Sequence, residues 1–263
     1  PRGKLHDALR AKFGLEALLI LPPTDRDTDD AEGLRKRTGL AAARLLTDLL
    51  SDGSVLGVAW GRTILELARA MARRPIPNTT VVQVSGSMLA EELSSPEYCT
   101  SLIANRIGAR SLNFHAPAVV SSTSLREALL REPPIQRYFE RLKHCDVIVF
   151  GAGAMNEAAQ LGDVNFANDA LTADYREKGA VSIFVGRFID IDGREIEGHL
   201  TDRQIAIDLA DIKRAPKRLL VASGLNKVDA IRGVLAGGYA THLVVDFATA
   251  CALAEDPEVT GEL

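Results

Sequence analysis

The sequence has few cysteines, few aromatic residues and no long apolar run. Its three cysteines (Cys99, Cys145 and Cys251) lie far apart and form no CxxC pair, and its five histidines follow no metal-ligand spacing. A disulfide framework or a bound metal is therefore not expected. No stretch approaches the roughly 20 apolar residues that cross a bilayer, and the first residues lack the apolar core of a signal peptide. We expect a cytoplasmic protein that contacts no membrane.

The sequence also lacks an excess of positive charge. It carries 31 lysine and arginine residues against 35 aspartate and glutamate residues, a net charge of −4, with the two signs interspersed. A protein that binds duplex DNA usually presents a basic stripe to the phosphates. If this protein controls a gene, we expect the part that contacts DNA to lie outside these residues.

Aliphatic residues are plentiful, and short β-rich runs alternate with amphipathic helical stretches. Hydrophobic residues make up 46% of the 263-residue chain and aromatic residues only 5%, which suits helices packed on a buried sheet. The run 146–150 is almost wholly apolar, as parallel strands usually are. We expect strands at 16–21, 55–58, 79–84, 111–114, 146–150, 218–222 and 241–245, and helices at 4–13, 34–49, 64–71, 102–107, 125–129, 135–142, 205–212, 228–235 and from 247 onward.

Other features refine this pattern. Residues 154–179 are less regular and suggest a lid or a small subdomain, and Asp192-Gly193 is typical of a hairpin turn between strands at 181–191 and 194–196. Capping boxes that begin at Thr63, Ser124 and Thr201 predict helix starts. The alternation of strands and helices predicts an α/β domain with a mostly parallel sheet, helices on both faces and a smaller inserted subdomain or lid.

Residues suited to anion binding follow several of the expected strands. Ligands of an open parallel sheet bind beyond the carboxyl ends of its strands. Glycine there lets backbone N–H groups approach an anion, and the helix N-terminus behind each loop adds positive potential. Arginine and lysine would add charge, and aspartate would bind sugar hydroxyls, so the pattern predicts a phosphate-binding loop beside a polyol-binding wall. The candidate binding residues are Gly57, Ala59, Trp60, Gly61, Arg62, Thr63, Gly86, Ser87, Gly151, Gly153, Arg187, Asp190, Lys227 and Asp246.

Each candidate also has an ordinary structural interpretation. Glycines at strand–helix junctions often serve only the turn, and Asp246 is equally suited to capping the final helix. Gly151-Ala152-Gly153 is similar to the start of a dinucleotide-binding loop, but Asn156 stands where that loop needs its third glycine. No GxSxG motif or convincing cysteine–histidine pair is present, so we expect no cofactor and no catalytic residue.

The ordered motifs of the chain resemble the sugar-binding domain of SorC-family transcriptional regulators. GVAWGRT at 57–63, GRFIDIDG at 186–193 and ASGLNKVDAI at 222–231 carry much of the resemblance, which runs over nearly the whole chain. The sequence departs from the family at Ser85 and Ser223, where many relatives have glycine, and these changes leave the identity of the sugar open.

The resemblance implies a Rossmann-like domain, similar in fold to phosphosugar isomerases, that senses a phosphorylated sugar and assembles as a dimer or tetramer. It implies that 57–63 binds the phosphate and that Lys227 and Asp246 match family positions. It also implies that residues 1–263 form one effector-binding domain and that the N-terminal helix-turn-helix domain, through which the whole protein would bind operator DNA, is absent from this chain. The alternative on the same fold is an enzyme resembling a phosphosugar isomerase or deaminase.

Overall fold

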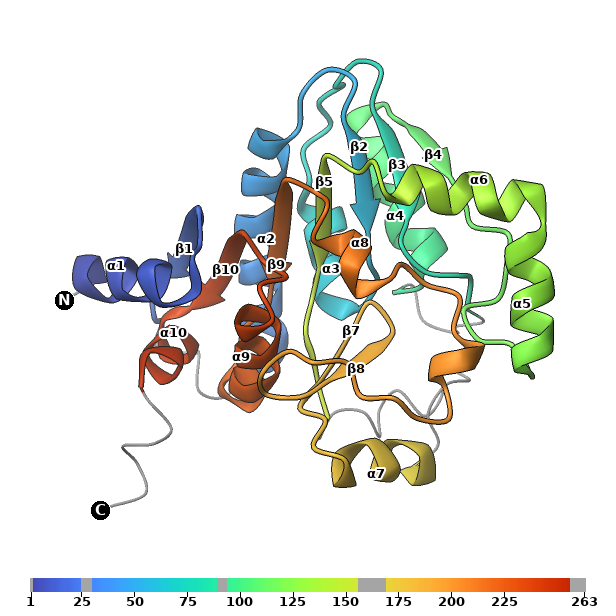
Figure 1. Cartoon of the computed structure of the whole chain (residues 1–263). Helices are drawn as coiled ribbons and strands as arrows, with labels where there is room; N and C mark the ends of the chain where they lie inside the picture. Colours follow the sequence, from blue (N-terminus) through green and yellow to red (C-terminus); the bar gives the residue numbers. More distant parts are fainter. Residues whose placement is uncertain (1, 25–29, 89–93, 156–168, 256–263) are drawn as a thin grey trace.

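The main sheet has seven strands in the order β1-β10-β9-β5-β2-β3-β4, and all of its pairings are parallel (Figure 1). The computed structural model describes residues 2–24, 30–88, 94–155 and 169–255. The mostly parallel sheet expected from the sequence is confirmed. Its strands are β1 (Ala17–Leu21), β2 (Val55–Val58), β3 (Thr80–Gln83), β4 (Arg110–Leu112), β5 (Val147–Phe150), β9 (Lys217–Val221) and β10 (His242–Asp246).

Helices cover both faces of this sheet, also as expected. Along β5, Val147 and Val149 pack in the cluster formed with α2, α3 and α4, whereas Ile148 and Phe150 pack in the cluster formed with α1, α9 and α10. This alternation explains why the strand is apolar at every position. The helices are α1 (Arg2–Phe13), α2 (Ala31–Leu49), α3 (Arg62–Ala70), α4 (Pro96–Ile107), α5 (Thr123–Arg131), α6 (Pro133–Leu142), α7 (Asp169–Glu177), α8 (Leu209–Ile212), α9 (Val228–Ala236) and α10 (Phe247–Ala254), with short 3₁₀ turns η2 (Thr201–Arg203) and η3 (Leu225–Lys227).

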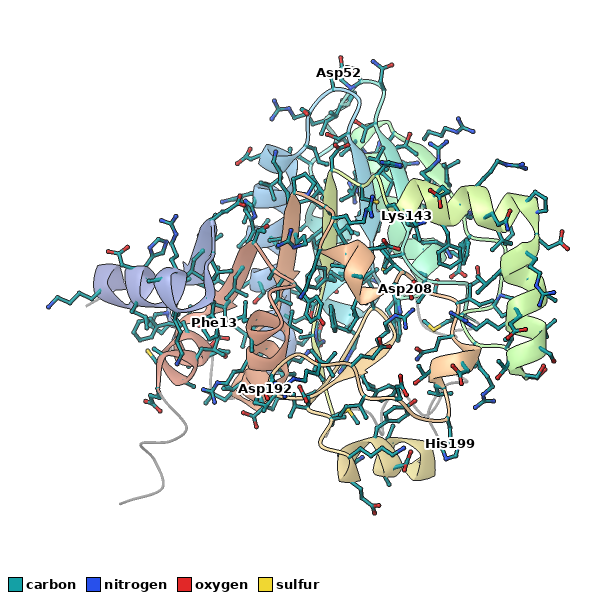
Figure 2. All side chains as sticks on the ribbon, in the orientation of Figure 1. Phe13, Asp52, Lys143, Asp192, His199 and Asp208 are labelled. Atoms are coloured by element: carbon teal, nitrogen blue, oxygen red, sulfur yellow. The ribbon has the colours of Figure 1, made fainter. Side chains whose placement is uncertain are left out.

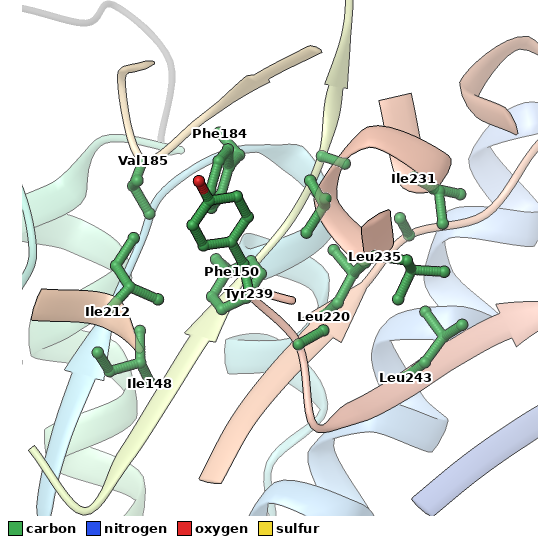
Figure 3. Close-up of a cluster of buried hydrophobic side chains, with 14 of the residues drawn as sticks. Ile148, Phe150, Phe184, Val185, Ile212, Leu220, Ile231, Leu235, Tyr239 and Leu243 are labelled. Carbon is green, nitrogen blue, oxygen red and sulfur yellow. The ribbon is translucent and has the colours of Figure 1, made fainter. Parts of the chain in front are cut away.

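A smaller antiparallel sheet is inserted between β5 and β9. It consists of β6 (Gly153–Ala154), β7 (Ser182–Phe184) and β8 (Arg187–Ile189), and α7 precedes β7. The Phe184 ring lies 5.6 Å from that of Phe150 and 5.0 Å from that of Tyr239, which seats the small sheet on the main core (Figure 3). The inserted unit expected from the sequence is therefore present, although residues 156–168 of that region lie outside the described residues.

The turn expected at Asp192-Gly193 is present: Ile189 and Glu195 form an antiparallel bridge across it, and the Asp190 N–H donates to Arg194 O at 2.9 Å. The strand expected at 181–191 is interrupted, because a second turn at Val185-Gly186, with φ values of 48° and 83°, divides it into β7 and β8. A positive φ is rare for a β-branched residue such as valine, so the sequence pattern does not indicate a turn there.

Residues 204–207 are extended, not helical as the sequence suggested. Ser85 forms a β-bridge with Ala206, and Val119 forms one with Gln204. The helix expected over 205–212 is therefore limited to the four residues of α8. The pattern was misread because Ile205 and Ile207, both fully buried, alternate with a period of two, as a strand requires.

The three capping boxes are also wrong. The N-cap positions of α3, α5 and η2 are occupied by Gly61, Ser122 and Leu200, and only Ser122 caps through its side chain, which accepts from the Leu125 N–H. The expected caps lie inside the first turns instead. Thr63 is consequently the second residue of α3, and its side chain is buried.

Candidate functional site

The loops predicted to bind a ligand follow five neighbouring strands of the main sheet. β10, β9, β5, β2 and β3 are consecutive in that sheet, so their carboxyl ends lie along one edge. From β2 the chain continues through α3 on one face, and from β9 it continues through α9 on the other face. This divergence marks the topological switch point of the sheet, where α/β proteins bind their ligands. The ends of β2 and β9 are two strand spacings apart, about 10 Å.

The loop after β2 leads into a helix whose N-cap residue has no side chain. The N–H of Ala59 donates to Val149 O at 2.9 Å and that of Gly61 to Ser94 O at 3.2 Å, which fix the loop to β5 and to the segment before α4. Gly61 is the N-cap of α3, so no N-cap side chain accepts from the first turn of that helix. The first-turn N–H groups of a helix have no acceptor within the helix itself. The start of α3 is therefore suited to an anion.

Gly61 is the residue that opens this loop. Its φ of 124° and ψ of 169° lie in a region of backbone space that is almost restricted to glycine. A Cβ added at Gly61 would meet no heavy atom of the described residues within 4 Å. Those residues therefore leave space directly above the loop. By contrast, a Cβ at Gly57 would lie 3.0–3.2 Å from Val84, Cys145 and Ile148, so Gly57 serves packing in the core.

The loop after β9 is tied to the end of β10. The N–H of Gly224 donates to Asp246 Oδ1 at 2.8 Å and to Thr249 Oγ1 at 3.0 Å. Asp246 Oδ2 accepts from the Thr249 N–H at 3.1 Å, so the carboxylate caps α10. The structural interpretation of Asp246 is therefore confirmed, and a contact with the ligand stays a prediction. Lys227 ends η3, directly before α9, whose first turn also has no side-chain cap.

The loops after β5 and β3 form the remaining walls. Gly153 pairs with Ile183 in the small sheet, and a Cβ at Gly151 would lie 3.5 Å from Val221 O. Gly86 is held between two segments: its N–H donates to Ile205 O at 2.8 Å, and a Cβ would lie 2.5 Å from Pro117 O. Gly86 thus has a packing reason besides any role in binding, as does Gly153, whose Cβ would lie 3.1 Å from Ile183 O, whereas a Cβ at Gly151 would make an ordinary contact.

One of the candidates, Asp190, is not brought together with the others. The side chain of Asp190 accepts from the N–H groups of Asp192 and Arg194, and its carbonyl packs on Gly233 in the second half of α9. Asp190 therefore lies toward the far end of α9 from Lys227. Figure 2 shows Asp192 of the same turn beside α9, and Asp208 beside α8 on the other side of the small sheet.

Arg187 is buried and fully engaged with protein groups. Its guanidinium donates to the carbonyls of Ala206 and Ile207 and to the carboxylates of Glu195 and Asp208, at 2.7–3.1 Å. Only 4% of the residue is exposed. The sequence pattern gave no sign of these partners, because the carbonyls lie 19 and 20 residues further along the chain.

Two of the three cysteine thiols, those of Cys99 and Cys145, are buried and poorly suited to act as nucleophiles. Burial raises the pKa of Cys99, which lies beneath Gly61, and of Cys145 to about 12, so both are protonated near neutral pH. The described part of the chain holds no group of three or more histidine, cysteine or acidic residues placed to bind a metal ion. It also holds no helix that is long and apolar enough to cross a membrane.

Comparison with known proteins identifies the class. A family model described as "Putative sugar-binding domain" matches residues 2–255. An Escherichia coli protein named "Uncharacterized transcriptional regulator YjhU" is 34% identical over 92% of this chain and 74% of its own length. The "Deoxyribonucleoside regulator" of Bacillus subtilis is 28% identical over 96% of this chain and 80% of its own length.

Solved structures agree on the fold. The full-length sorbitol operon regulator SorC from Klebsiella pneumoniae aligns with a TM-score of 0.87 and 22% identity, over 96% of this chain and 80% of the other. The fold and the matches therefore define the effector-binding domain of a transcriptional regulator. The chain belongs to the sugar-binding domain family of SorC-type regulators.

Proposed function

We propose that this domain binds a phosphorylated sugar in the crevice beyond β2, β5 and β9, and that it does not catalyse a reaction of this ligand. The phosphate would bind at the start of α3, where the N-cap Gly61 has no side chain and the described residues leave space above it. This open helix N-terminus is the observation that carries the proposal, because backbone N–H groups and the helix dipole favour an anion there. Arg62 and Thr63 stand in the same turn.

The remaining candidates would surround the sugar. The loop after β9 would contact the sugar from the opposite side of β5. The carboxyl ends of β2 and β9 are about 10 Å apart, a distance that one small sugar phosphate can bridge. The set proposed to contact the ligand omits Gly57, which packs in the core, Asp190, which lies toward the far end of α9, and Arg187, whose guanidinium is occupied by protein acceptors. It consists of Ala59, Trp60, Gly61, Arg62, Thr63, Gly86, Ser87, Gly151, Gly153, Lys227 and Asp246.

A sensing role fits the relatives, which are named as transcriptional regulators, and fits the protonated thiols beside the site. The alternative of a phosphosugar isomerase or deaminase would need a general base at the sugar. Three further points stay predictions. The protein would self-associate as a dimer or tetramer, it would be cytoplasmic, and it would contact DNA only through a domain outside residues 1–263.

A thermal-shift screen tests the proposal. The panel would contain ribose 5-phosphate, fructose 6-phosphate, glucosamine 6-phosphate, glycerol 3-phosphate and inorganic phosphate. A specific ligand at a hundredfold excess over its Kd stabilises the native state by about 2.7 kcal/mol. We expect at least one sugar phosphate to raise the Tm and to be recovered unchanged after incubation. Turnover of that compound would favour the enzyme, and no shift with any phosphorylated sugar would contradict the proposal.

A further inference from the structure

Arg187 connects two parts of the molecule that border the candidate site. It is the first residue of β8, directly after the Val185-Gly186 turn of the small sheet. Its guanidinium reaches the extended segment 204–208, where it donates to Ala206 O at 3.1 Å, Ile207 O at 2.8 Å and Asp208 Oδ1 at 2.7 Å. A second link lies beside it, because Gln204 Nε2 donates to Gly186 O.

The segment that Arg187 holds is itself bonded to a wall of the site. Ile207 N–H donates to Val84 O at 2.8 Å, and Gly86 N–H donates to Ile205 O at 2.8 Å. The loop after β3 is therefore paired with 205–207 on one side. On its other side, Ser87 N–H donates to Ala116 O at 2.7 Å. The position of Gly86 and Ser87 consequently depends on where 204–208 is held.

The small sheet in turn is bonded to the loop after β5. β7 pairs with β6, so Ile183 lies opposite Gly153. The small sheet thus connects the two walls. At one end β7 pairs with β6 beside Gly151–Gly153, and at the other end Arg187 of β8 holds the segment that pairs with Ser85–Ser87. A buried arginine with two carbonyl and two carboxylate acceptors is a rigid junction, because the planar guanidinium fixes all of its partners at once.

We infer that Arg187 is a positioning residue for effector binding: it holds the segment 204–208, and through it the Gly86–Ser87 wall, in register with the Gly151–Gly153 wall. It touches no ligand itself. The inference deepens the proposed function and rests on it for the effect on affinity, whereas the effect on the wall can be measured without any ligand.

The test compares Arg187→Lys with Arg218→Lys. Lysine keeps the charge but cannot bond two carbonyls and two carboxylates together. Arg218 is a matched control, because its guanidinium likewise donates to backbone carbonyls, those of Lys213, Ala215, Gly238 and Tyr239. It is the second residue of β9 and lies near the amino ends of the strands, whereas the site lies at their carboxyl ends.

Amide hydrogen exchange is the readout that needs no ligand. Arg187→Lys should speed exchange at Gly86 and Ile207 and leave Val244 in β10 unchanged, whereas Arg218→Lys should not affect Gly86. Affinity is then measured, at a temperature below the Tm of both variants, for the sugar phosphate that gives the largest thermal shift in the panel. It should fall about tenfold in Arg187→Lys and stay unchanged in Arg218→Lys.

A purely structural role predicts a different result: both variants lose stability and neither loses affinity. Unchanged exchange at Gly86, or unchanged affinity in Arg187→Lys, would overturn the inference. If Arg187→Lys fails to fold, Gln204→Met removes the neighbouring link to Gly186 and should show the same local exchange and loss of affinity. If no sugar phosphate binds even the wild type, the proposed function fails, and the exchange data alone decide whether Arg187 positions the wall.

Discussion

Replacing Gly61 with alanine should weaken both the fold and the site, for separable reasons. Gly61 holds a φ of 124° and a ψ of 169°, which an L-residue adopts only with strain of about 1–3 kcal/mol. No atom of the described residues lies within 4 Å of the added Cβ, so we expect the loss of stability to come from the backbone and not from a clash. Each kcal/mol should lower the Tm by about 2–4 °C in a domain of this size.

The same methyl group would stand in the space assigned to the phosphate. We therefore expect Gly61→Ala to lose affinity for a sugar phosphate by more than its stability explains. The single tryptophan of the chain, Trp60, adjoins Gly61, so its fluorescence can follow the titration, and urea unfolding can measure stability on the same sample.

Gly53→Ala is the matched control. Gly53 also has a positive φ, 78°, and open space around its Cβ, but it lies in the turn before β2, at the other end of that strand. Its replacement should lower stability and leave affinity unchanged. If Gly61→Ala is as stable as the wild type, the argument from strain is wrong. If it binds the sugar phosphate as tightly as the wild type, the phosphate does not bind at this loop.

Three further predictions follow from buried groups. Asp246→Ala removes an acceptor shared by two backbone N–H groups and should lower the free energy of unfolding in urea by about 1–2 kcal/mol; an unchanged value would refute the capping role. Burial raises the pKa of Cys99 and Cys145 to about 12, so a thiol reagent at about pH 8 should label no cysteine except Cys251 until urea is added. Burial lowers the pKa of His242 from its ordinary value of 6.5. As the pH falls, the unfolded state therefore binds a proton before the folded state does, so the free energy of unfolding should decrease below about pH 6.5. His242→Gln should make this decrease with pH smaller.

The sequence predicted the features that depend on local pattern. The apolar run of β5 and the alternation of strands and helices fixed the parallel sheet, because strands buried on both faces need apolar residues at every position. The loop 57–63 was likewise evident, since glycines followed a strand and preceded an amphipathic helix. These signals reside in neighbouring residues, so one sequence is enough to read them.

The features that depend on distant partners were missed. The sequence predicts a ligand contact for Arg187, which follows a glycine, but the acceptors of its guanidinium include the carbonyls of residues 206 and 207, which no local pattern indicates. The turn at Val185 was hidden because a β-branched residue seldom adopts a positive φ. Asp190 was grouped with the site for its residue type, although the turn that holds it packs on the second half of α9.

The central claim is that the open start of α3 binds a phosphate, and the most direct test compares one sugar with and without that group. Isothermal titration of the wild type would use the sugar phosphate that gives the largest thermal shift, then the same sugar unphosphorylated. Each hydrogen bond from a backbone N–H to a charged group contributes about 1.5–3 kcal/mol. The phosphate ester should therefore bind at least tenfold more tightly than the unphosphorylated sugar. Equal affinity for the two compounds would show that the loop 57–63 is not a phosphate site.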